Sequence, residues 1–466
     1  MMANDSKIKA GQRFVVMGMG VSGRAAVQFL LQQGAEVAVS DASAFADLAE
    51  LDQKIIMENE LSFEGGGHTA SFCSNCDTVF ISPGIPTNIA IVTHLHERGI
   101  PVVGELAIAA PYLTETIIAV TGTNGKTTVT ALIGELLRHA GKEVFVGGNI
   151  GTPILDYLRQ GKRVEFLVLE LSSFQLESAG NFRPHIGILL NITPDHLDRH
   201  NNMVEYAAAK MKMFLHQEKD DIAILCDGDP MSQQIKSLLS CQKKFCFGSD
   251  DSTCSARGNG STFTIMLDTQ DPVSYSLKGT TLDSHTGLLN SEAAVLAVSL
   301  LGCEKREIES GLKHFTLAAH RLQFVREQNG VSYYNDSKAT NTGAVVTALA
   351  SFSANHVILL AGGKDKGEDY TALRESVGAK VKELILLGEA AEAIEASLSA
   401  VVSTSRAKNM EDAVHLAAEF AEPGDTVLLA PACASFDMFD NYGQRGDVYM
   451  QAVMEICETE TEKVEL

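Results

Sequence analysis

Cysteine, positive charge and long apolar runs are all scarce in this chain. Its 466 residues include nine cysteines at irregular spacing, which suits a reducing compartment better than a disulfide scaffold. Cys73 and Cys76 form one CxxC, but no second pair completes a zinc motif. Lys and Arg total 37 against 59 Asp and Glu, a formal net charge of −22. A nucleic-acid partner requires a basic face, so we expect none.

The apolar runs are short throughout. FLVLEL and TVLLA have the length of strands, and no run approaches the roughly 20 residues of a membrane helix. The first residues, MMANDSKIKAGQRF, hold no apolar segment of the signal-peptide kind. We therefore expect no membrane insertion and a cytoplasmic location.

Apolar residues nevertheless make up 45% of the chain, which is enough for packed cores, and the length favours two to four domains. Ten short runs have the pattern of buried strands: RFVVMG, EVAVSD, TVFISPG, IIAVTG, FLVLELSS, IGILLNIT, DIAILC, HVILLAGG, LILLG and TVLLAP. Helix-length segments separate them, which predicts an α/β fold with parallel sheets covered on both faces. Ligands of such sheets bind beyond the carboxyl ends of the strands.

Three blocks organise the chain, and we place them at residues 1–104, 105–317 and 318–466. The first opens with RFVVMGMGVSG, the second contains IIAVTGTNGKTT, and the third begins near HRLQFV. Residues 250–286 are polar and alternate like exposed strands (STFTIML, VSYSLKG). This stretch predicts a small antiparallel sheet within the second block.

IIAVTGTNGKTTVTALIGELL is a strand, a glycine loop and a helix. Gly122 and Gly125 allow a tight loop whose N–H groups can cradle phosphate oxygens at the helix N-terminus. Lys126 can reach the outer phosphates of a nucleotide, and Thr127 can offer a hydroxyl to Mg²⁺. Val120 occupies the first glycine position of the phosphate-loop motif, but the strand–loop–helix context still predicts nucleotide binding.

A phosphate loop needs an acid near the metal, at the end of a neighbouring strand. Glu170 ends the apolar run FLVLE, where an isolated carboxylate would be costly to bury, and a Mg²⁺ ion would explain its presence. NITPDHLDRH follows the next strand and carries His196 and His200. Because no HExxH or third soft ligand accompanies them, we interpret His196 as a ligand of a second Mg²⁺ rather than of zinc.

A second glycine motif lies near the N-terminus. Gly18, Gly20 and Gly23 have G-x-G-x-x-G spacing between a strand and a helix, and Asp41 ends the next strand. This is the dinucleotide-binding fingerprint, and it predicts that a pyrophosphate docks on the helix N-terminus. Taken alone, the fingerprint leaves an NAD-dependent dehydrogenase as an alternative function. A nucleotide-gated binding protein without chemistry is a further alternative.

Motifs along almost the whole chain resemble those of the Mur ligases: GMGVSG, GTNGKTT, GGNIG, ELSSFQLE, NITPDHLDRH, YAAAK, HR, NDSKATN, GGKDKG and PACASFDMFDNYGQRG. The resemblance implies a Rossmann-like N-terminal domain, a central P-loop ATPase domain and a Rossmann-like C-terminal domain. NDSKATN and PACASFD are similar to the D-glutamate-adding members. The resemblance to the Mur ligases further implies a monomer that joins D-glutamate to UDP-N-acetylmuramoyl-L-alanine in peptidoglycan synthesis. The reaction would use ATP and Mg²⁺ and pass through an acyl phosphate.

Site residues also follow from the resemblance, each at the position of a matching motif. Catalytic and metal-holding roles fall to Lys126, Thr127, Glu170, His196 and Lys210. ATP contacts fall to Gly122, Thr123, Asn124, Gly125, Lys126, Thr127, Thr128, Asn290, Arg321 and Asp336. Contacts with the UDP-linked substrate fall to Gly20, Val21, Ser22, Gly23, Asp41, Asn149 and Gln175. D-Glutamate contacts fall to Thr340, Lys366, Ser435, Phe436 and Tyr442.

Lys210 has a special expected role, because the family carries the lysine of this helix as a carbamate. Carbon dioxide would turn its amine into an anion near Mg²⁺. The chain also departs from the family in two places. Ala293 stands where a second adenine-binding asparagine is usual, and Asp41 is followed by Ala42 and Ser43, without the arginine of some members.

Overall fold

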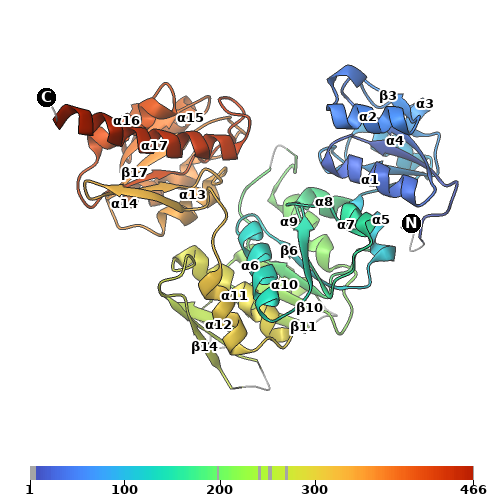
Figure 1. Ribbon diagram of the computed structural model, residues 1–466, viewed down its shortest axis with the longest axis horizontal. Helices are drawn as coiled ribbons and strands as arrows, with labels where there is room; N and C mark the ends of the chain where they lie inside the picture. Colours follow the sequence, from blue (N-terminus) through green and yellow to red (C-terminus); the bar gives the residue numbers. More distant parts are fainter. Residues whose placement is uncertain (1–6, 197–198, 240–242, 250–253, 268–270, 465–466) are drawn as a thin grey trace.

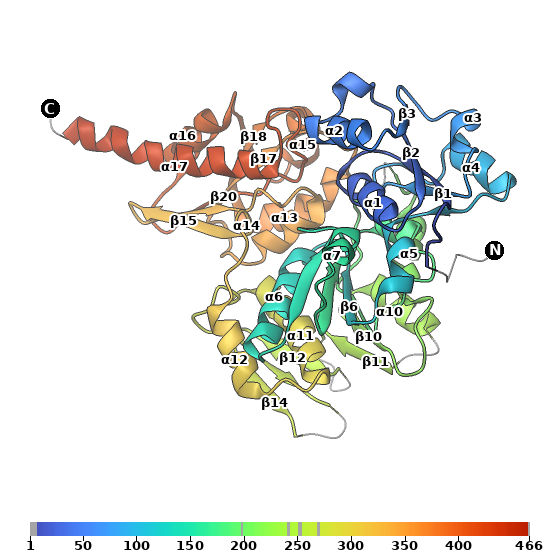
Figure 2. The ribbon, with the colours of Figure 1, turned by 45° about the vertical axis from the view of Figure 1, so that its right-hand side comes forward.

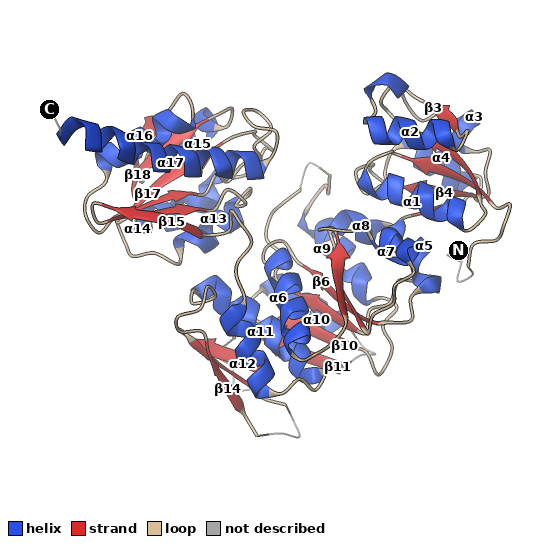
Figure 3. Ribbon diagram, in the orientation of Figure 1, coloured by secondary structure: helices blue, strands red, loops and turns tan. Residues whose placement is uncertain are grey.

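The computed structural model describes residues 7–196, 199–239, 243–249, 254–267 and 271–464. Figure 1 shows three α/β parts in chain order, from the blue N-terminal part through the green and yellow central part to the orange and red C-terminal part. Figure 3, coloured by secondary structure, shows a sheet with helices packed against it in each part. The α/β prediction is confirmed.

The N-terminal part holds a five-stranded parallel sheet in the order β3-β2-β1-β4-β5. This is the order of a Rossmann-like half, with the switch point beside β1. The strands are Arg13–Met17, Glu36–Ser40, Ser62–Glu64, Thr78–Ile81 and Val102–Val103. The helices are α1 (Val21–Gln32), α2 (Glu50–Glu58), α3 (Ala70–Cys73) and α4 (Ala90–Glu97).

The central part is built on a six-stranded parallel sheet in the order β11-β10-β9-β6-β8-β7. In chain order, β6 to β11 span Thr116–Thr121, Val144–Gly148, Phe166–Glu170, Ile186–Leu189, Ile222–Cys226 and Lys243–Phe247. Helices α5 to α10 span Glu105–Ala109, Lys126–His139, Ile154–Gln160, Ser173–Glu177, Met203–Met211 and Pro230–Leu238. Two further helices, α11 (His285–Leu300) and α12 (Lys305–His314), pack beside α6.

The antiparallel sheet expected within residues 250–286 is present as β12 (Ala256–Asn259), β13 (Thr262–Ile265) and β14 (Val273–Ser276). Residues 250–253 and 268–270 of that prediction lie outside the described residues. The inward-facing side chains of these strands, among them Phe263 and Tyr275, join the apolar core under α6 and α11. The small sheet therefore extends the central core.

The C-terminal part has a six-stranded sheet in the order β15-β16-β20-β17-β18-β19. Only the β15–β16 pair is antiparallel. Strands β15 to β20 span Gln323–Gln328, Val331–Asn335, Val357–Gly362, Val381–Leu387, Ser403–Arg406 and Thr426–Leu429. Helices α13 to α17 span Thr342–Leu349, Arg374–Lys380, Ala391–Leu398, Met410–Phe420 and Tyr442–Val464.

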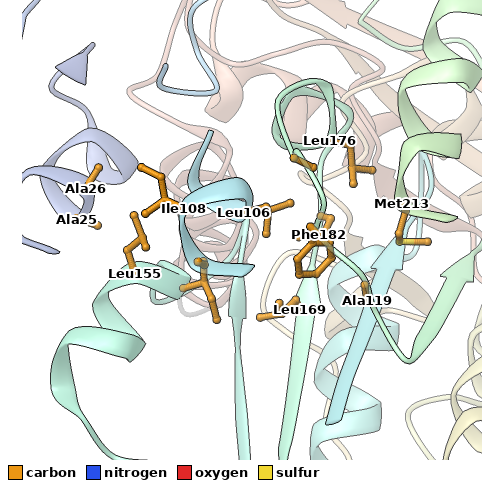
Figure 4. Close-up of a cluster of buried hydrophobic side chains, with 14 of the residues drawn as sticks. Ala25, Ala26, Leu106, Ile108, Ala119, Leu155, Leu169, Leu176, Phe182 and Met213 are labelled. Carbon is orange, nitrogen blue, oxygen red and sulfur yellow. The ribbon is translucent and has the colours of Figure 1, made fainter. Parts of the chain in front are cut away.

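An apolar interface joins the N-terminal and central parts. Ala25 and Ala26 of α1 share a core with Ile108 of α5 and Leu155 of α7 (Figure 4). The turned view in Figure 2 shows α1 above α7 and α5 at this junction, with the C-terminal part at the upper left, above the central part. Among the described residues, no helix combines the length and the apolar character needed to cross a membrane.

Candidate active site

The phosphate loop runs from the end of β6 to the start of α6. Gly122 has φ 148° and Gly125 has φ 85°, backbone conformations that favour glycine. A Cβ at Gly122 would also lie 3.0 Å from the Leu190 side chain. Asn124 is fixed by a reciprocal pair of hydrogen bonds with Asn191, its N–H donating at 2.8 Å and its carbonyl accepting at 3.0 Å. The glycines therefore permit the tight loop that the sequence predicted.

Lys126, the first residue of α6, folds back into this loop. Its Nζ donates to the carbonyl oxygens of Gly122 at 3.0 Å and Thr123 at 2.7 Å. Burial lowers the pKa of Lys126, against the opposing pull of the Glu170 and Asp195 carboxylates. The Lys126 ammonium is thus held inside the loop. Phosphate oxygens bound there would compete with the Gly122 and Thr123 carbonyls for its hydrogen bonds.

Glu170 ends β8, the neighbour of β6, and only 2% of it is exposed. Its carboxylate accepts hydrogen bonds from Thr127 Oγ1 at 2.7 Å and Asn149 Nδ2 at 3.0 Å. The two expected Mg²⁺ ligands, Thr127 and Glu170, are therefore brought together. Asn149, expected at the UDP-linked substrate, lies in this same cluster.

Lys210 of α9 reaches the phosphate loop from the opposite side. Its Nζ donates to the Gly122 carbonyl at 2.8 Å and lies 4.4 Å from the ring centre of Tyr206. Burial first, and the nearby Lys126 cation second, hold the pKa of Lys210 well below its usual value. Because a neutral amine is the form that reacts with carbon dioxide, the environment favours the expected modification.

His196 lies after β9, with its backbone at φ 55°. Its N–H donates to Asp195 Oδ1 at 3.0 Å, and its ring lies 4.8 Å from the Phe174 ring. His200 bonds Ser173 Oγ at 3.0 Å, and its ring lies 5.7 Å from the same Phe174 ring. Among the described residues, no three His, Cys, Asp or Glu side chains are arranged to hold a metal ion. The hard oxygens of Glu170 and Thr127 nevertheless fit Mg²⁺ chemistry.

A cleft of about 740 Å³ separates the central part from the C-terminal part. Six of the residues expected to contact ATP line it: Asn124, Gly125, Thr128, Asn290, Arg321 and Asp336. Burial raises the pKa of Asp336 to about 6 and lowers the pKa of the neighbouring Lys338 to about 8. Ala293 is fully buried in the central core.

Sequence reasoning missed the aromatic wall of this cleft. Phe324, Tyr334 and Phe352 line it and pack edge to face, with ring centres 5.5 and 5.1 Å apart. These rings offer a flat apolar surface of the kind on which a nucleobase stacks. Phe324 lies in HRLQFV and Tyr334 directly precedes NDSKATN, but nothing in the spacing of the three aromatic residues indicates that they form one wall.

The loops expected to bind D-glutamate meet at the carboxyl edge of the C-terminal sheet. Lys366 Nζ donates to the Thr340 carbonyl at 3.4 Å, and the Lys364 N–H pairs with the Ala434 carbonyl at 2.9 Å beside Ser435. Ser435 is 2% exposed and Phe436 is 72% exposed. Tyr442 begins α17, and its ring lies 3.7 Å from the Lys338 ammonium. Tyr442 thus faces Lys338, which the sequence prediction omitted.

The residues expected to bind the UDP-linked substrate fall into two groups. The glycine turn, residues 18–23, lies at the carboxyl edge of the N-terminal sheet, and a Cβ at Gly23 would lie 1.9 Å from the Gly18 carbonyl oxygen. Asp41 accepts from the Met19 N–H at 2.6 Å, and Val21 is exposed. Gln175 is in the central part, where its side-chain oxygen accepts from the Ser172 N–H at 3.1 Å. A ligand that touches both groups must span two domains.

Comparisons with known proteins agree with this architecture. Three family models match: the Mur ligase MurD-like N-terminal domain over residues 12–104, the Mur ligase middle domain over 120–298, and the Mur ligase glutamate ligase domain over 320–433. These matches give no support to the dehydrogenase alternative.

Two curated relatives carry the same protein name. The chain is 46% identical to the UDP-N-acetylmuramoylalanine–D-glutamate ligase of Desulfotalea psychrophila, covering 98% of this chain and 99% of the relative. It is 38% identical to the ligase of that name from Desulfosudis oleivorans, covering 96% and 97%.

Solved structures share the fold at lower identity. A pseudomurein peptide ligase type C from Methanothermus fervidus is 17% identical with a TM-score of 0.61, covering 96% of this chain and 100% of that one. The MurF ligase of Thermotoga maritima in complex with ADP is 18% identical with a TM-score of 0.59, covering 99% and 97%.

Proposed function

The chain belongs to the Mur ligase family, and on that premise we propose that it joins D-glutamate to UDP-N-acetylmuramoyl-L-alanine at the expense of ATP, in peptidoglycan synthesis. The strongest support is the 46% identity over 98% of the chain to a relative named for this reaction. A phosphate loop opening on a nucleotide-sized cleft supports the ATP requirement.

Two chemical steps account for the ligation. The alanine carboxylate attacks the γ-phosphorus of ATP, which forms an acyl phosphate and releases ADP. The neutral amine of D-glutamate then attacks the acyl carbon and loses a proton, and inorganic phosphate leaves from the tetrahedral intermediate to give the amide. Catalysis of phosphoryl transfer depends mainly on positioning and charge neutralisation. Lys126 and the loop N–H groups supply both where the phosphates would bind.

We propose Mg²⁺ as the metal, held by Glu170 and Thr127, with His196 at a second ion. Bound Mg²⁺ neutralises the negative charge of the phosphates. The Asn149 amide donates a hydrogen bond to the Glu170 oxygen that Thr127 does not contact, and so fixes the orientation of the carboxylate. Lys210, proposed to be a carbamate, would add a second buried anion beside the loop. Its depressed pKa supplies the neutral amine that this modification requires.

The three parts would divide the substrates among them. In this proposal residues 1–104 bind the UDP moiety at the glycine turn, residues 105–317 bind the ATP phosphates, and residues 318–466 bind D-glutamate and close over the nucleotide. Lys366 would pair with a D-glutamate carboxylate, with Thr340, Ser435, Phe436 and Tyr442 around it. We further propose that the protein acts as a cytoplasmic monomer, where ATP and nucleotide-linked precursors are available.

Phosphate release tests this function. Purified protein with ATP and Mg²⁺ should release phosphate only when UDP-N-acetylmuramoyl-L-alanine and D-glutamate are both present. L-Glutamate, D-aspartate and D-glutamine should give little turnover, because buried donors would be left unpaired or misplaced. Binding of ATP and the UDP-linked substrate without any product would indicate the binding-protein alternative instead.

A further inference from the structure

Arg199 connects the N-terminal part to the central part through one buried side chain. It follows His196 by three residues, and only 9% of its side chain is exposed. Its Nη1 donates to the Pro83 carbonyl at 2.6 Å, and its Nη2 donates to the Ile85 carbonyl at 3.1 Å. Nη2 also donates to Glu177 Oε2 at 2.7 Å. Pro83 and Ile85 belong to the N-terminal part, whereas Glu177 ends α8 of the central part.

The segment that Arg199 holds, residues 82–87, lies against the glycine turn. Ser82 Oγ donates to the Gly18 carbonyl at 2.7 Å, and a Cβ at Gly18 would lie 3.0 Å from Ile85. At the other end of the segment, Thr87 Oγ1 donates to the same Glu177 oxygen at 3.2 Å. Movement of this segment would therefore move the turn proposed to bind the UDP moiety.

The guanidinium of Arg199 also packs on an aromatic ring of the central part that lies beside His196. Its guanidinium stacks on the Phe174 ring at 4.2 Å, and the same ring contacts His196 at 4.8 Å. Phe174 belongs to α8, four residues after the end of β8 at Glu170. One planar cation thus touches the segment that packs against the glycine turn in one domain and the aromatic ring beside His196 in the other.

The apolar interface of α1 with α5 and α7 lies elsewhere on the junction (Figure 4). Its residues lie on α1, α5 and α7, whereas Arg199 bonds segment 82–87 and the end of α8, so the apolar interface would keep the two parts docked without the guanidinium. Arg199 fixes the orientation of the two parts relative to each other, because its planar guanidinium bonds two carbonyls and one carboxylate at once. A lysine ammonium cannot reproduce this geometry.

We propose that Arg199 is a positioning residue that sets the spacing between the glycine turn and the phosphoryl-transfer centre. The inference rests on the proposed function. UDP-N-acetylmuramoyl-L-alanine would be held at its nucleotide end by the N-terminal part and at its carboxylate end by the central part. Two linked contacts bind strongly only when the distance between their sites matches the ligand. A loosened junction would weaken binding of the whole substrate and leave each end's own contacts intact.

The test compares Arg199→Lys with wild type and with Arg183→Lys. Arg183 is a matched control, because it makes a similar fork to Asp221 and Glu218 at 2.6 and 2.8 Å within the central part alone. We expect Arg199→Lys to raise the KM for UDP-N-acetylmuramoyl-L-alanine on the order of 10-fold, with the KM values for ATP and D-glutamate nearly unchanged. Arg183→Lys should lower the melting temperature similarly and leave all three KM values near those of wild type.

Binding measurements without ATP separate positioning from local damage. UDP alone, which would reach only the N-terminal part, should bind equally to wild type and Arg199→Lys, whereas the full substrate should bind on the order of 10-fold more weakly to the variant. The inference would be overturned if Arg199→Lys bound UDP as much more weakly as it binds the full substrate, or if its KM for the full substrate were unchanged. If wild type itself releases no phosphate from the complete mixture, the proposed function fails instead.

Discussion

Replacing Lys126 with methionine removes one charge from the phosphate loop and keeps the side-chain length. The ammonium lies 3.0 and 2.7 Å from two loop carbonyls, where it would meet the transferring phosphoryl group. Loss of such a charge contact typically costs about 10²–10³ in turnover, or about 2.7–4 kcal/mol of transition-state stabilisation. We expect a loss of kcat/KM of that size for Lys126→Met, measured by phosphate release.

The same change should leave folding nearly intact. Burial lowers the pKa of Lys126, which shows that the folded state disfavours its charge. Removing the charge relieves that cost, while the Thr123 carbonyl loses a donor and Gly122 keeps the one from Lys210. These opposing effects should keep the change in unfolding free energy below about 2 kcal/mol.

Calorimetry with and without ATP completes the comparison. Wild type should gain about 2.7 kcal/mol of stability when ATP is present at 100 times its Kd, and Lys126→Met should gain much less. Lys142→Met is the control, because Lys142 follows α6 at its far end and pairs with Glu165 on the surface. Normal phosphate release by Lys126→Met, together with a normal ATP-dependent stabilisation, would refute the role of the loop.

Three further changes test other parts of the site. Lys210→Ala should be nearly inactive and partly restored by formate or acetate, and intact-mass or crystallographic evidence of an unmodified Lys210 in active, bicarbonate-supplied enzyme would refute the carbamate. Lys366→Ala should raise the KM for D-glutamate at least 10-fold and that for ATP much less; an unchanged D-glutamate KM would remove Lys366 from the pocket. Asp336→Asn should stabilise the protein at pH 7 by at most about 3 kcal/mol, since a pKa raised from 3.8 to about 6 makes the folded state favour the uncharged form. That gain should fall as the pH drops below about 6, be small at pH 4 and vanish below about pH 3, where Asp336 is protonated in both states; melting curves at pH 4 and pH 7 that show the same difference would contradict the pKa assignment.

The ten apolar runs of the sequence all correspond to strands, namely β1, β2, β4, β6, β8, β9, β10, β17, β18 and β20. The strands that no apolar run predicted include the two edge strands of each large sheet: β3 and β5, β11 and β7, and β15 and β19. An edge strand is partly exposed, so its sequence need not be apolar. Strand β19, for example, reads STSR. Pattern reasoning therefore finds most interior strands of the large sheets, with β16 (Val331–Asn335) as the exception, and misses their borders.

Local motifs predicted the parts of the site that one chain segment builds. Gly122, Gly125 and Lys126 belong to one loop, and Thr127 meets Glu170 because β6 and β8 are neighbours. Contacts between domains left no local pattern. The bond from Asn341 Nδ2 to Asp195 Oδ2, 3.1 Å long, joins residues 146 positions apart. Such pairs depend on how the domains dock, which residue spacing does not encode.

The central claim is that ATP activates the alanine carboxylate as an acyl phosphate, and oxygen transfer tests it directly. UDP-N-acetylmuramoyl-L-alanine labelled with ¹⁸O in its alanine carboxylate is incubated with ATP, Mg²⁺, D-glutamate and the protein. Mass spectrometry of the released phosphate should find one labelled oxygen in each phosphate, because the carboxylate oxygen that attacks phosphorus leaves with it. Unlabelled phosphate accompanying ligated product would contradict the acyl phosphate.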